Sequence, residues 1–178
     1  MVLKPQDVYV ALKIVAAQSG RAPYSQLAAE LVMSPSEVHA SVQRAQSCHL
    51  LHGPQRKNRP NFSALEEFLL HGLKYVFPPD RGELTRGIPT SYAAEPLRHL
   101  IAQGSEPSPV WPHEEGTIRG LGFEPLYRTA PMAALRDRVF YEYLALADAL
   151  RDGRTRERSV AEAELCRRLR ECNERLKS

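Results

Sequence analysis

The 178-residue chain has few cysteines and no long hydrophobic run. Its three cysteines, Cys48, Cys166 and Cys172, are odd in number and form no CxxC pair, which indicates neither a disulfide framework nor a zinc knuckle. The apolar stretches are short and interrupted by charges, and no apolar signal segment follows Lys4 and Pro5. We therefore expect a soluble, cytoplasmic protein without a membrane partner.

The motifs of common enzymes are also missing. There is no GxSxG, no HExxH, no Walker loop and no spaced acidic pair of the kind that a metal-dependent nuclease uses. Cys48, His49 and His52 lie close together in the sequence, but no fourth ligand is evident near them. The sequence thus predicts no catalytic residues, no metal site and no cofactor, and we do not expect an enzyme.

What the chain does have is an uneven distribution of charge around a composition typical of globular domains. It is 43% hydrophobic and 25% charged, enough for one medium domain or two small ones. Residues 1–62 hold seven basic and three acidic side chains, whereas the remainder holds 17 basic and 18 acidic ones. A basic N-terminal part joined to a nearly neutral remainder indicates a module that faces a polyanion.

The N-terminal part has the signals of three helices and a hairpin. Apolar residues at helical spacing predict helices over 5–19 and from Ser25 to about Val32. A third helix, 35–48, begins at Ser34-Pro35-Ser36-Glu37, a capping box with proline in the first turn. A short strand at 49–53, a basic tip and a returning strand at Asn61-Phe62 follow. This order is typical of a winged helix-turn-helix.

Residues Tyr24 to Ala45 resemble the helix-turn-helix of winged-helix bacterial transcription regulators, including the MarR-like group. The small Ala28 lets two helices cross closely, and apolar residues on both helices join them: Leu27, Leu31, Val38 and Val42. The resemblance covers the first third of the chain. The chain lacks the long dimerisation helix that precedes the winged domain in MarR-like proteins, and a purely structural helical pair is the alternative.

The resemblance implies that helix 35–48 lies in the major groove of double-stranded DNA. Gln43 would then pair with adenine and Arg44 with guanine, while Ser34 and Ser36 suit phosphates and Glu37 serves mainly as the reciprocal cap. Basic residues at the wing tip would contact the backbone or the minor groove. The predicted DNA-binding residues are Ser34, Ser36, Glu37, His39, Ala40, Gln43, Arg44, Arg56, Lys57 and Arg59.

Beyond the winged part, a capping box of Ser63 and Glu66 predicts a linking helix over 63–77. Residues 78–131 contain nine of the 14 prolines, which argues against long helices and regular inner strands there. Within this segment, 109–112 and 117–123 have the pattern of a β-hairpin.

The chain is predicted to end in two antiparallel helices. One runs from Pro131 to Gly153, and the last begins at a Ser159 cap. Their apolar stripes, 135–150 and 165–176, can form a dimer interface or belong to the protein's own core.

Together these features predict an α+β, mainly helical protein. Its parts are a winged helix-turn-helix at 1–62, a linking helix at 63–77, and a Pro-rich segment with a C-terminal helical hairpin at 78–178. The predicted function is a sequence-specific DNA-binding transcriptional regulator that acts as a homodimer. Two alternatives remain: an antitoxin-like or assembly subunit that holds a protein partner with 78–178, and an enzyme with a pocket around Arg86, Thr90 and Arg119.

Overall fold

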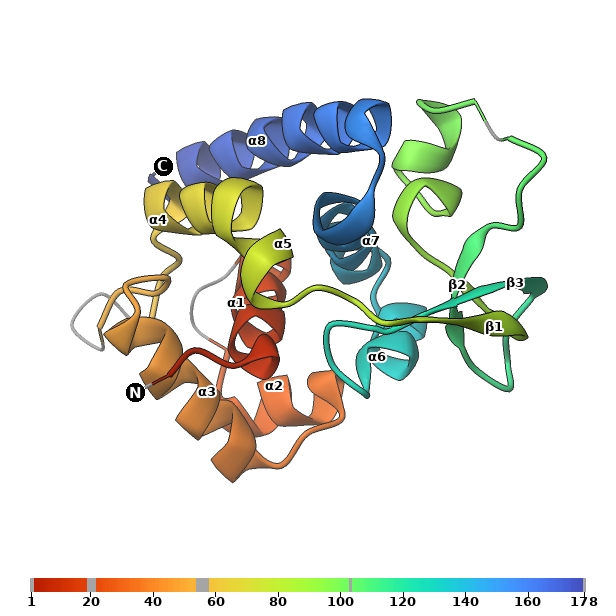
Figure 1. Ribbon diagram of the computed structural model, residues 1–178. Coiled ribbons are helices and arrows are strands. Elements are labelled where there is room, and N and C mark those ends of the chain that lie inside the picture. Colours follow the sequence, from red (N-terminus) through yellow and green to blue (C-terminus); the bar gives the residue numbers. More distant parts are fainter. Residues whose placement is uncertain (1, 19–21, 54–57, 103, 178) are drawn as a thin grey trace.

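The computed structural model describes residues 2–18, 22–53, 58–102 and 104–177, and it has an α+β, mainly helical architecture (Figure 1). Helix α8 lies along one edge of the molecule and α2 and α3 along the opposite edge, with α1 and α7 between them. The short strands lie at the side remote from α3. The helices and strands, in chain order, are α1 (Pro5–Ala17), α2 (Tyr24–Leu31), α3 (Pro35–Ser47), α4 (Phe62–Glu67), the π-helical η2 (Phe68–Gly72), α5 (Leu73–Val76), β1 (Arg81–Pro89), the 3-10 turns η3 (Ser91–Ala93) and η4 (Leu97–His99), β2 (Pro109–Pro112), β3 (Ile118–Phe123), α6 (Ala130–Arg136), α7 (Arg138–Asp152) and α8 (Thr155–Lys177).

Helix α1 is the central element of the core. Every side chain from Asp7 to Ala16 is buried, since α3 packs on one side of the helix and α7 on another. The buried apolar residues of the predicted segments 1–62, 63–77 and 78–178 form one continuous cluster. The N-terminal helices therefore share their core with the C-terminal ones.

Of the predicted wing, the structure describes the base, residues 49–53 and 58–60. An antiparallel bridge joins Leu51 to Pro60, and the amide of His52 donates to the carbonyl of Arg59 at 2.8 Å. Both bridge residues are buried, which fixes the hairpin ends against the helices.

The linking helix is continuous but starts earlier than predicted. It begins at Phe62, so Ser63 lies inside its first turn and does not cap it; the N-cap is Asn61. Leu65, Leu69 and Leu73 form its buried stripe, while Tyr75 is exposed. Phe68, Leu70 and Phe77 are partly buried and also pack against the core.

The Pro-rich segment contains three strands that form a small closed barrel, and the predicted hairpin is wrong. Strands β2 and β3 occur where expected but pair in parallel, and both pair antiparallel with β1, a strand that the proline content argued against. The barrel closes tightly because glycines stand at its contact points. A Cβ added at Gly87 would lie 2.2 Å from the Trp111 carbonyl oxygen, and one at Gly120 would lie 2.1 Å from the Ser108 carbonyl oxygen.

A buried polar cluster joins this barrel to α7. The carboxylate of Asp148, which is 1% exposed, accepts hydrogen bonds from Thr90 Oγ1 and Trp111 Nε1, both at 2.7 Å. The Arg151 guanidinium donates to the same carboxylate at 2.8 Å and also to the carbonyls of Phe77 and Glu124. Burial raises the pKa of Asp148 despite the nearby guanidinium.

The C-terminal helices differ from prediction at two positions. The first predicted helix is broken at Asp137, whose carboxylate caps α7 by accepting from the amide of Phe140 at 3.0 Å. The last helix begins at Thr155, one turn before the predicted Ser159 cap. Helices α7 and α8 pack against each other, and an ion pair joins Glu142 to Arg168.

Most of the apolar stripe predicted for these helices is buried in the protein's own core. Leu146, Leu150, Leu165 and Leu169 are at most 1% exposed, whereas Leu135 remains 49% exposed. The middle of the helical hairpin therefore offers no apolar surface to a partner.

Among the described residues, no helix combines the length and apolar character needed to span a membrane.

Candidate nucleic-acid interface

The residues between α2 and α3 set the position of α3. Helix α2 ends at Leu31, and its C-cap, Val32, adopts a left-handed conformation with φ 55° and donates its amide to the carbonyl of Ala28. The predicted capping box at the start of α3 is confirmed: Ser34 Oγ accepts from the Glu37 amide at 3.3 Å, and the Glu37 carboxylate accepts from the Ser34 amide at 2.9 Å. These contacts fix the angle at which α3 leaves the turn.

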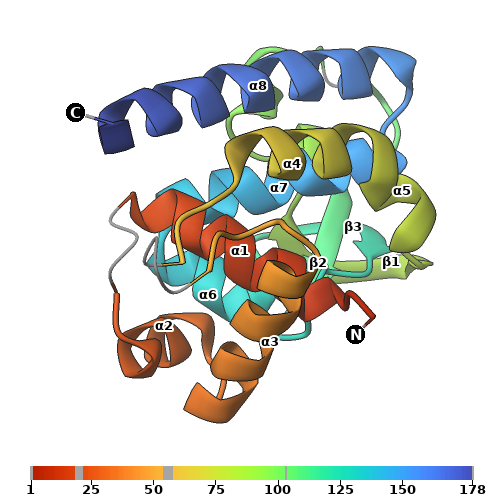
Figure 2. The ribbon, with the colours of Figure 1, turned by 90° about the vertical axis from the view of Figure 1, so that its left-hand side faces the viewer.

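Helix α3 packs through one apolar face. Val38, Ser41, Val42 and Ala45 are buried against α1 and α2. In Figure 2 the opposite side of α3 faces the viewer. The helix lies at the front of the molecule, and no other element crosses it. This arrangement leaves one whole side of a 13-residue helix accessible.

The predicted contact residues on α3 are not equally accessible. Ser34, Ser36, His39 and Gln43 are exposed, and Glu37 and Ala40 are partly exposed. Ser36, His39 and Gln43 follow one another at spacings of three and four residues, so they share one side of the helix.

Arg44 is placed differently from the sequence expectation. Its guanidinium forms a bidentate ion pair with Asp7, with Nη2 2.7 Å from Oδ1 and Nε 2.9 Å from Oδ2. The Asp7 side chain is fully buried and the Arg44 side chain is 13% exposed. The hydrogen bonds that Arg44 donates to Asp7 raise the pKa of Arg44, which keeps it charged. Arg44 is thus oriented toward α1 rather than outward.

A chain of side-chain contacts that the sequence did not reveal holds the wing base against α2 and α3. Asn58 accepts from Gln46 Nε2 at 2.6 Å and donates through Nδ2 to the Tyr24 hydroxyl at 3.0 Å. The Tyr24 ring meets the His39 ring edge-on, with centroids 5.4 Å apart. Asn58 adopts φ 56°, a conformation that asparagine tolerates better than most residues. A polar residue with turn propensity beside the basic tip was the only signal in the sequence.

Of the three predicted wing cations, only Arg59 falls within the described residues; Arg56 and Lys57 lie outside them. Arg59 is exposed and donates to the Leu176 carbonyl at 3.2 Å, so the end of α8 lies beside the wing base.

The negative charge at the start of α3 is compensated by a segment distant in sequence. Tyr127 donates its hydroxyl hydrogen to Glu37 at 3.2 Å, and Arg128 Nη2 lies 3.7 Å from the same carboxylate. Hydrogen bonds from Ser34 are the main reason that the pKa of Glu37 is lowered. Arg128, whose side chain is 77% exposed, adds a cation next to the α3 N-terminus.

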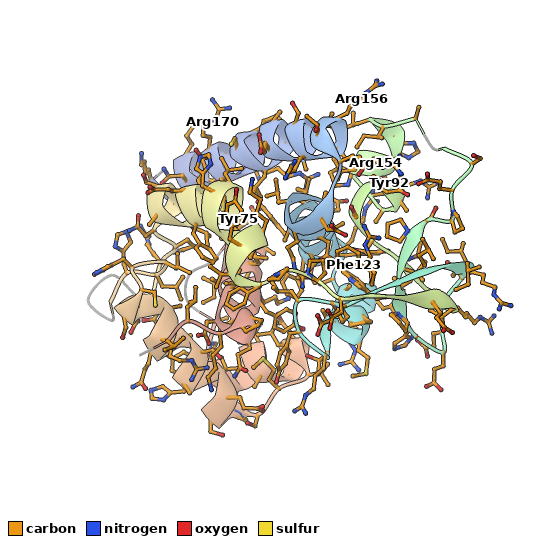
Figure 3. All side chains as sticks on the ribbon, in the orientation of Figure 1. Tyr75, Tyr92, Phe123, Arg154, Arg156 and Arg170 are labelled. Carbon is orange, nitrogen blue, oxygen red and sulfur yellow. The ribbon has the colours of Figure 1, made fainter. Side chains whose placement is uncertain are left out.

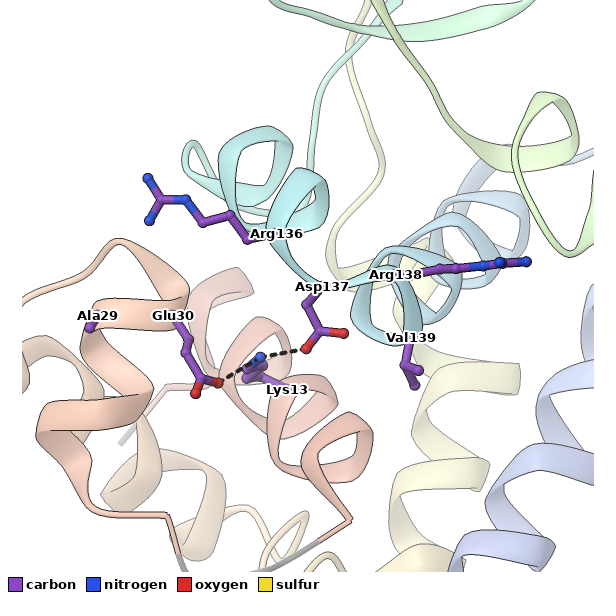
Figure 4. A pocket seen from close by; sticks show the side chains of 7 residues that line it. All are labelled: Lys13, Ala29, Glu30, Arg136, Asp137, Arg138 and Val139. Carbon is purple, nitrogen blue, oxygen red and sulfur yellow. Dashed lines mark hydrogen bonds and ion pairs between the residues drawn. The ribbon is translucent and has the colours of Figure 1, made fainter.

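A buried lysine connects α1 and α2 to the C-terminal helices. Lys13 on α1 is 4% exposed in its side chain and lies 2.8 Å from Glu30 of α2 and 2.5 Å from Asp137 at the start of α7 (Figure 4). Burial acts to lower the pKa of Lys13, but the hydrogen bonds that it donates to Asp137 and Glu30 outweigh burial and raise the pKa. The three groups line an open depression of about 560 Å³ that is bordered by Arg136, Arg138 and Val139.

The other candidate residues do not converge on a site. Arg86 and Arg119 are opposite each other on β1 and β3 and are both exposed, but Thr90 is buried with its hydroxyl bonded to Asp148. No group of three or more His, Cys, Asp or Glu side chains that could hold a metal ion occurs in the part of the chain that the structure describes.

The arginines around the α7–α8 junction are also separated from one another. Arg151 is buried with Asp148, and Arg154 is ion-paired with Glu106. Arg156 and Arg170 project outward from α8 (Figure 3). Two of these four arginines are therefore engaged in ion pairs within the protein.

Comparisons with known proteins identify no relative of this chain. No protein-family model, no curated protein and no solved structure gives a significant match to the chain. The interpretation of the exposed side of α3 and of the wing base therefore depends on their own geometry and chemistry.

Proposed function

We propose that the protein is a sequence-specific DNA-binding transcriptional regulator that places α3 in the major groove and the wing on the phosphate backbone. The observation that carries this proposal is the exposed polar side of α3, which is capped, rigidly packed on α1 and uncovered by other elements. Thirteen helical residues extend about 20 Å, long enough to cross a major groove about 12 Å wide.

The roles of the side chains follow from their exposure. Gln43 offers a donor and an acceptor that match the major-groove edge of adenine, and His39 stands one turn before it on the same side. Ser36 is exposed at the α3 N-terminus, where a hydroxyl suits a phosphate, whereas the hydroxyl and amide of Ser34 are used in the cap with Glu37. Arg128 and Arg59 supply charge for the backbone. Arg44 is assigned no base, because its pair with Asp7 occupies its guanidinium.

The test is fluorescence anisotropy with two labelled duplexes of equal length, one from the region upstream of the protein's own coding sequence and one scrambled. Wild-type protein, Gln43→Ala and His39→Ala are titrated at several salt concentrations. We expect wild type to prefer the upstream duplex, and Gln43→Ala to reduce that preference by about 1 to 3 kcal/mol, the discrimination that one bidentate base contact provides.

Thr117→Ala is the matched control, because it removes an exposed, uncharged polar group just before β3, at the side of the molecule remote from α3. It should bind both duplexes as wild type does. Equal affinity of wild type for the two duplexes, unchanged in Gln43→Ala, would rule out sequence reading by α3. No binding at low salt would exclude DNA as the ligand.

A second candidate, a protein-binding subunit, is favoured by the outer face of β1 and β3. Leu84 and Leu121 are directly opposite and are 51% and 36% exposed, and Arg86 and Arg119 form the next pair on the same face. Opposed like charges are unfavourable unless an anionic group lies between them. A partner with carboxylates beside aliphatic side chains would satisfy this face, and Leu84→Asp with Arg119→Glu should abolish its binding while leaving DNA affinity unchanged.

A further inference from the structure

Exposed apolar side chains gather where α6 meets α7. Met132 and Leu135 lie one turn apart on the outward side of α6 and are 37% and 49% exposed, and Val139 in the first turn of α7 is 39% exposed. We call these three residues the corner surface. Burying large apolar side chains is favourable, so leaving three of them in water is unfavourable.

The corner surface is hollowed on both sides of Val139. This residue borders the depression of about 560 Å³ around Lys13 and a second one of about 260 Å³ between α7 and α8. The first depression is also lined by Ala29 and Glu30 of α2 (Figure 4). The apolar side chain of Val139 thus stands between two hollows of the surface.

Charges of both signs surround the corner surface. Arg136 and Arg138 border the first depression, together with the carboxylates of Glu30 and Asp137. Arg138 is 83% exposed and pairs with Glu142 at 3.1 Å. Arg136 is exposed and has no ion-pair partner among the described residues. A surface of mixed sign is unsuited to a polyanion such as DNA but is complementary to itself.

We propose that the corner surface binds the corner surface of a second copy of this chain, which gives a two-fold symmetric dimer. In a two-fold interface each patch meets the same patch of the other copy. The rotation therefore brings a protrusion of one copy opposite a hollow of the other, and a cation opposite a carboxylate. Leu135 and Met132 of one copy enter the depressions of the other, and Arg136 faces the partner copy's acidic rim.

The interface places the second copy directly against α2. Ala29 and Glu30 lie on the helix that precedes α3, so the dimer sets the separation of the two α3 helices. That consequence rests on the proposed DNA-binding function, since paired recognition helices read half-sites about one helical turn apart. The association itself is measured without DNA, so the two proposals can fail separately.

The experiment is sedimentation velocity of the full chain from about 1 to 100 µM, a range that detects dimers of micromolar affinity. We expect a monomer–dimer equilibrium for wild type. Leu135→Glu and Val139→Glu should each raise the dimer dissociation constant at least tenfold, because each puts a charge into the apolar contact. Arg136→Glu should raise it to a smaller extent.

Leu100→Glu is the matched control, since Leu100 is 53% exposed and lies outside the corner surface. It should dimerise as wild type does, and circular dichroism of all variants should confirm that they remain folded. A wild-type protein that stays monomeric up to 100 µM would overturn the proposal. So would a dimer that Leu135→Glu and Val139→Glu leave intact.

Discussion

At the scale of single residues, the sequence could not show which charged groups are used inside the protein. Arg44 has the spacing of a base-reading residue, yet it is held by Asp7 from the opposite helix. Asp148 and Arg151 stand in a charged stretch that is typical of a solvated surface, yet both are buried. Contacts with residues distant in the sequence determine whether such a charged group is buried, and a single sequence does not show those contacts.

The Asp148 cluster gives the first prediction. Asp148→Ala should lower the free energy of unfolding by about 3 to 5 kcal/mol, because it leaves the buried Arg151 guanidinium without its anion and Trp111 Nε1 without its acceptor. Urea unfolding followed by circular dichroism measures this change. Asp152→Asn breaks the exposed pair with Arg81 and should cost less than about 1 kcal/mol. Similar losses for both variants would contradict this interpretation of the cluster.

The cap of α3 gives the second prediction. Ser34→Ala removes the acceptor of the Glu37 amide and should cost about 1 kcal/mol of stability. Ser34→Asp preserves an acceptor at this position and should remain within a few tenths of wild type. Thermal unfolding of the two variants side by side distinguishes the cap from a general effect of substitution, since equal losses would mean that Ser34 acts in another way.

At the scale of elements, local signals predicted the helices well and the strands poorly. The Ser34–Glu37 box gave α3, and apolar spacing gave α1, α2 and the existence of the linking and C-terminal helices. The break at Asp137 was missed because the sequence does not distinguish an aspartate inside a continuous helix from one that caps a new helix. Asp137 caps α7 by accepting from the amide of Phe140. Strand β1 was missed because its glycines and charged residues are not typical of a strand. Its partner strands also lie about 30 residues further along the chain.

For the candidate site, the sequence predicted the exposed side of α3 but not its surroundings. Ser36, His39 and Gln43 face outward as helical periodicity requires. The contacts of Glu37 with Tyr127 and Arg128 depend on a loop some 90 residues away, and no local pattern encodes such a contact.

The barrel glycines give the third prediction. Gly120→Ala places a methyl group 2.1 Å from a backbone oxygen, which cannot move aside as a flexible side chain does, so the strands must separate. We expect a loss of about 1 to 3 kcal/mol, the usual cost of overpacking, or more. Gly104→Ala, whose nearest neighbour would lie 4.0 Å away, should change stability by less than about 0.5 kcal/mol. Equal melting temperatures for these two variants would show that the barrel is not closely packed at Gly120.

At the scale of the whole molecule, a shared core and the buried Lys13 join the N-terminal helices to the C-terminal ones. Helix α1 is covered by both α3 and α7, and Lys13 on α1 pairs with carboxylates from α2 and from the start of α7. Lys13 thus links the α6–α7 corner to α2 through two short ion pairs. This linkage explains how a dimer contact at the corner surface can fix the orientation of the proposed recognition helix.

The same linkage makes stability depend on pH in a defined direction. Hydrogen bonds from Lys13 are the main cause of the lowered pKa of Glu30; for Asp137, burial opposes the shift, but Lys13 and the Phe140 amide outweigh it and lower the pKa. A carboxyl whose pKa is lower in the folded state contributes stability above its unfolded pKa, about 4, and loses it as the pH falls through the folded value.

Lys13→Met tests this dependence. Without the ammonium group the two carboxyls lose the cause of their lowered pKa, so the variant should be less stable at neutral pH and should lose less stability between about pH 5 and pH 3 than wild type does. Urea unfolding at a series of pH values measures both slopes, and Lys177→Met, which removes an exposed lysine at the end of α8, should keep the wild-type slope. Because the pKa of Lys13 is raised, its own contribution is present at neutral pH and should disappear only when the pH rises above about 10.5. Parallel acid slopes for wild type and Lys13→Met would mean that the carboxylates are stabilised by other groups and that α2 and α7 are not linked through Lys13.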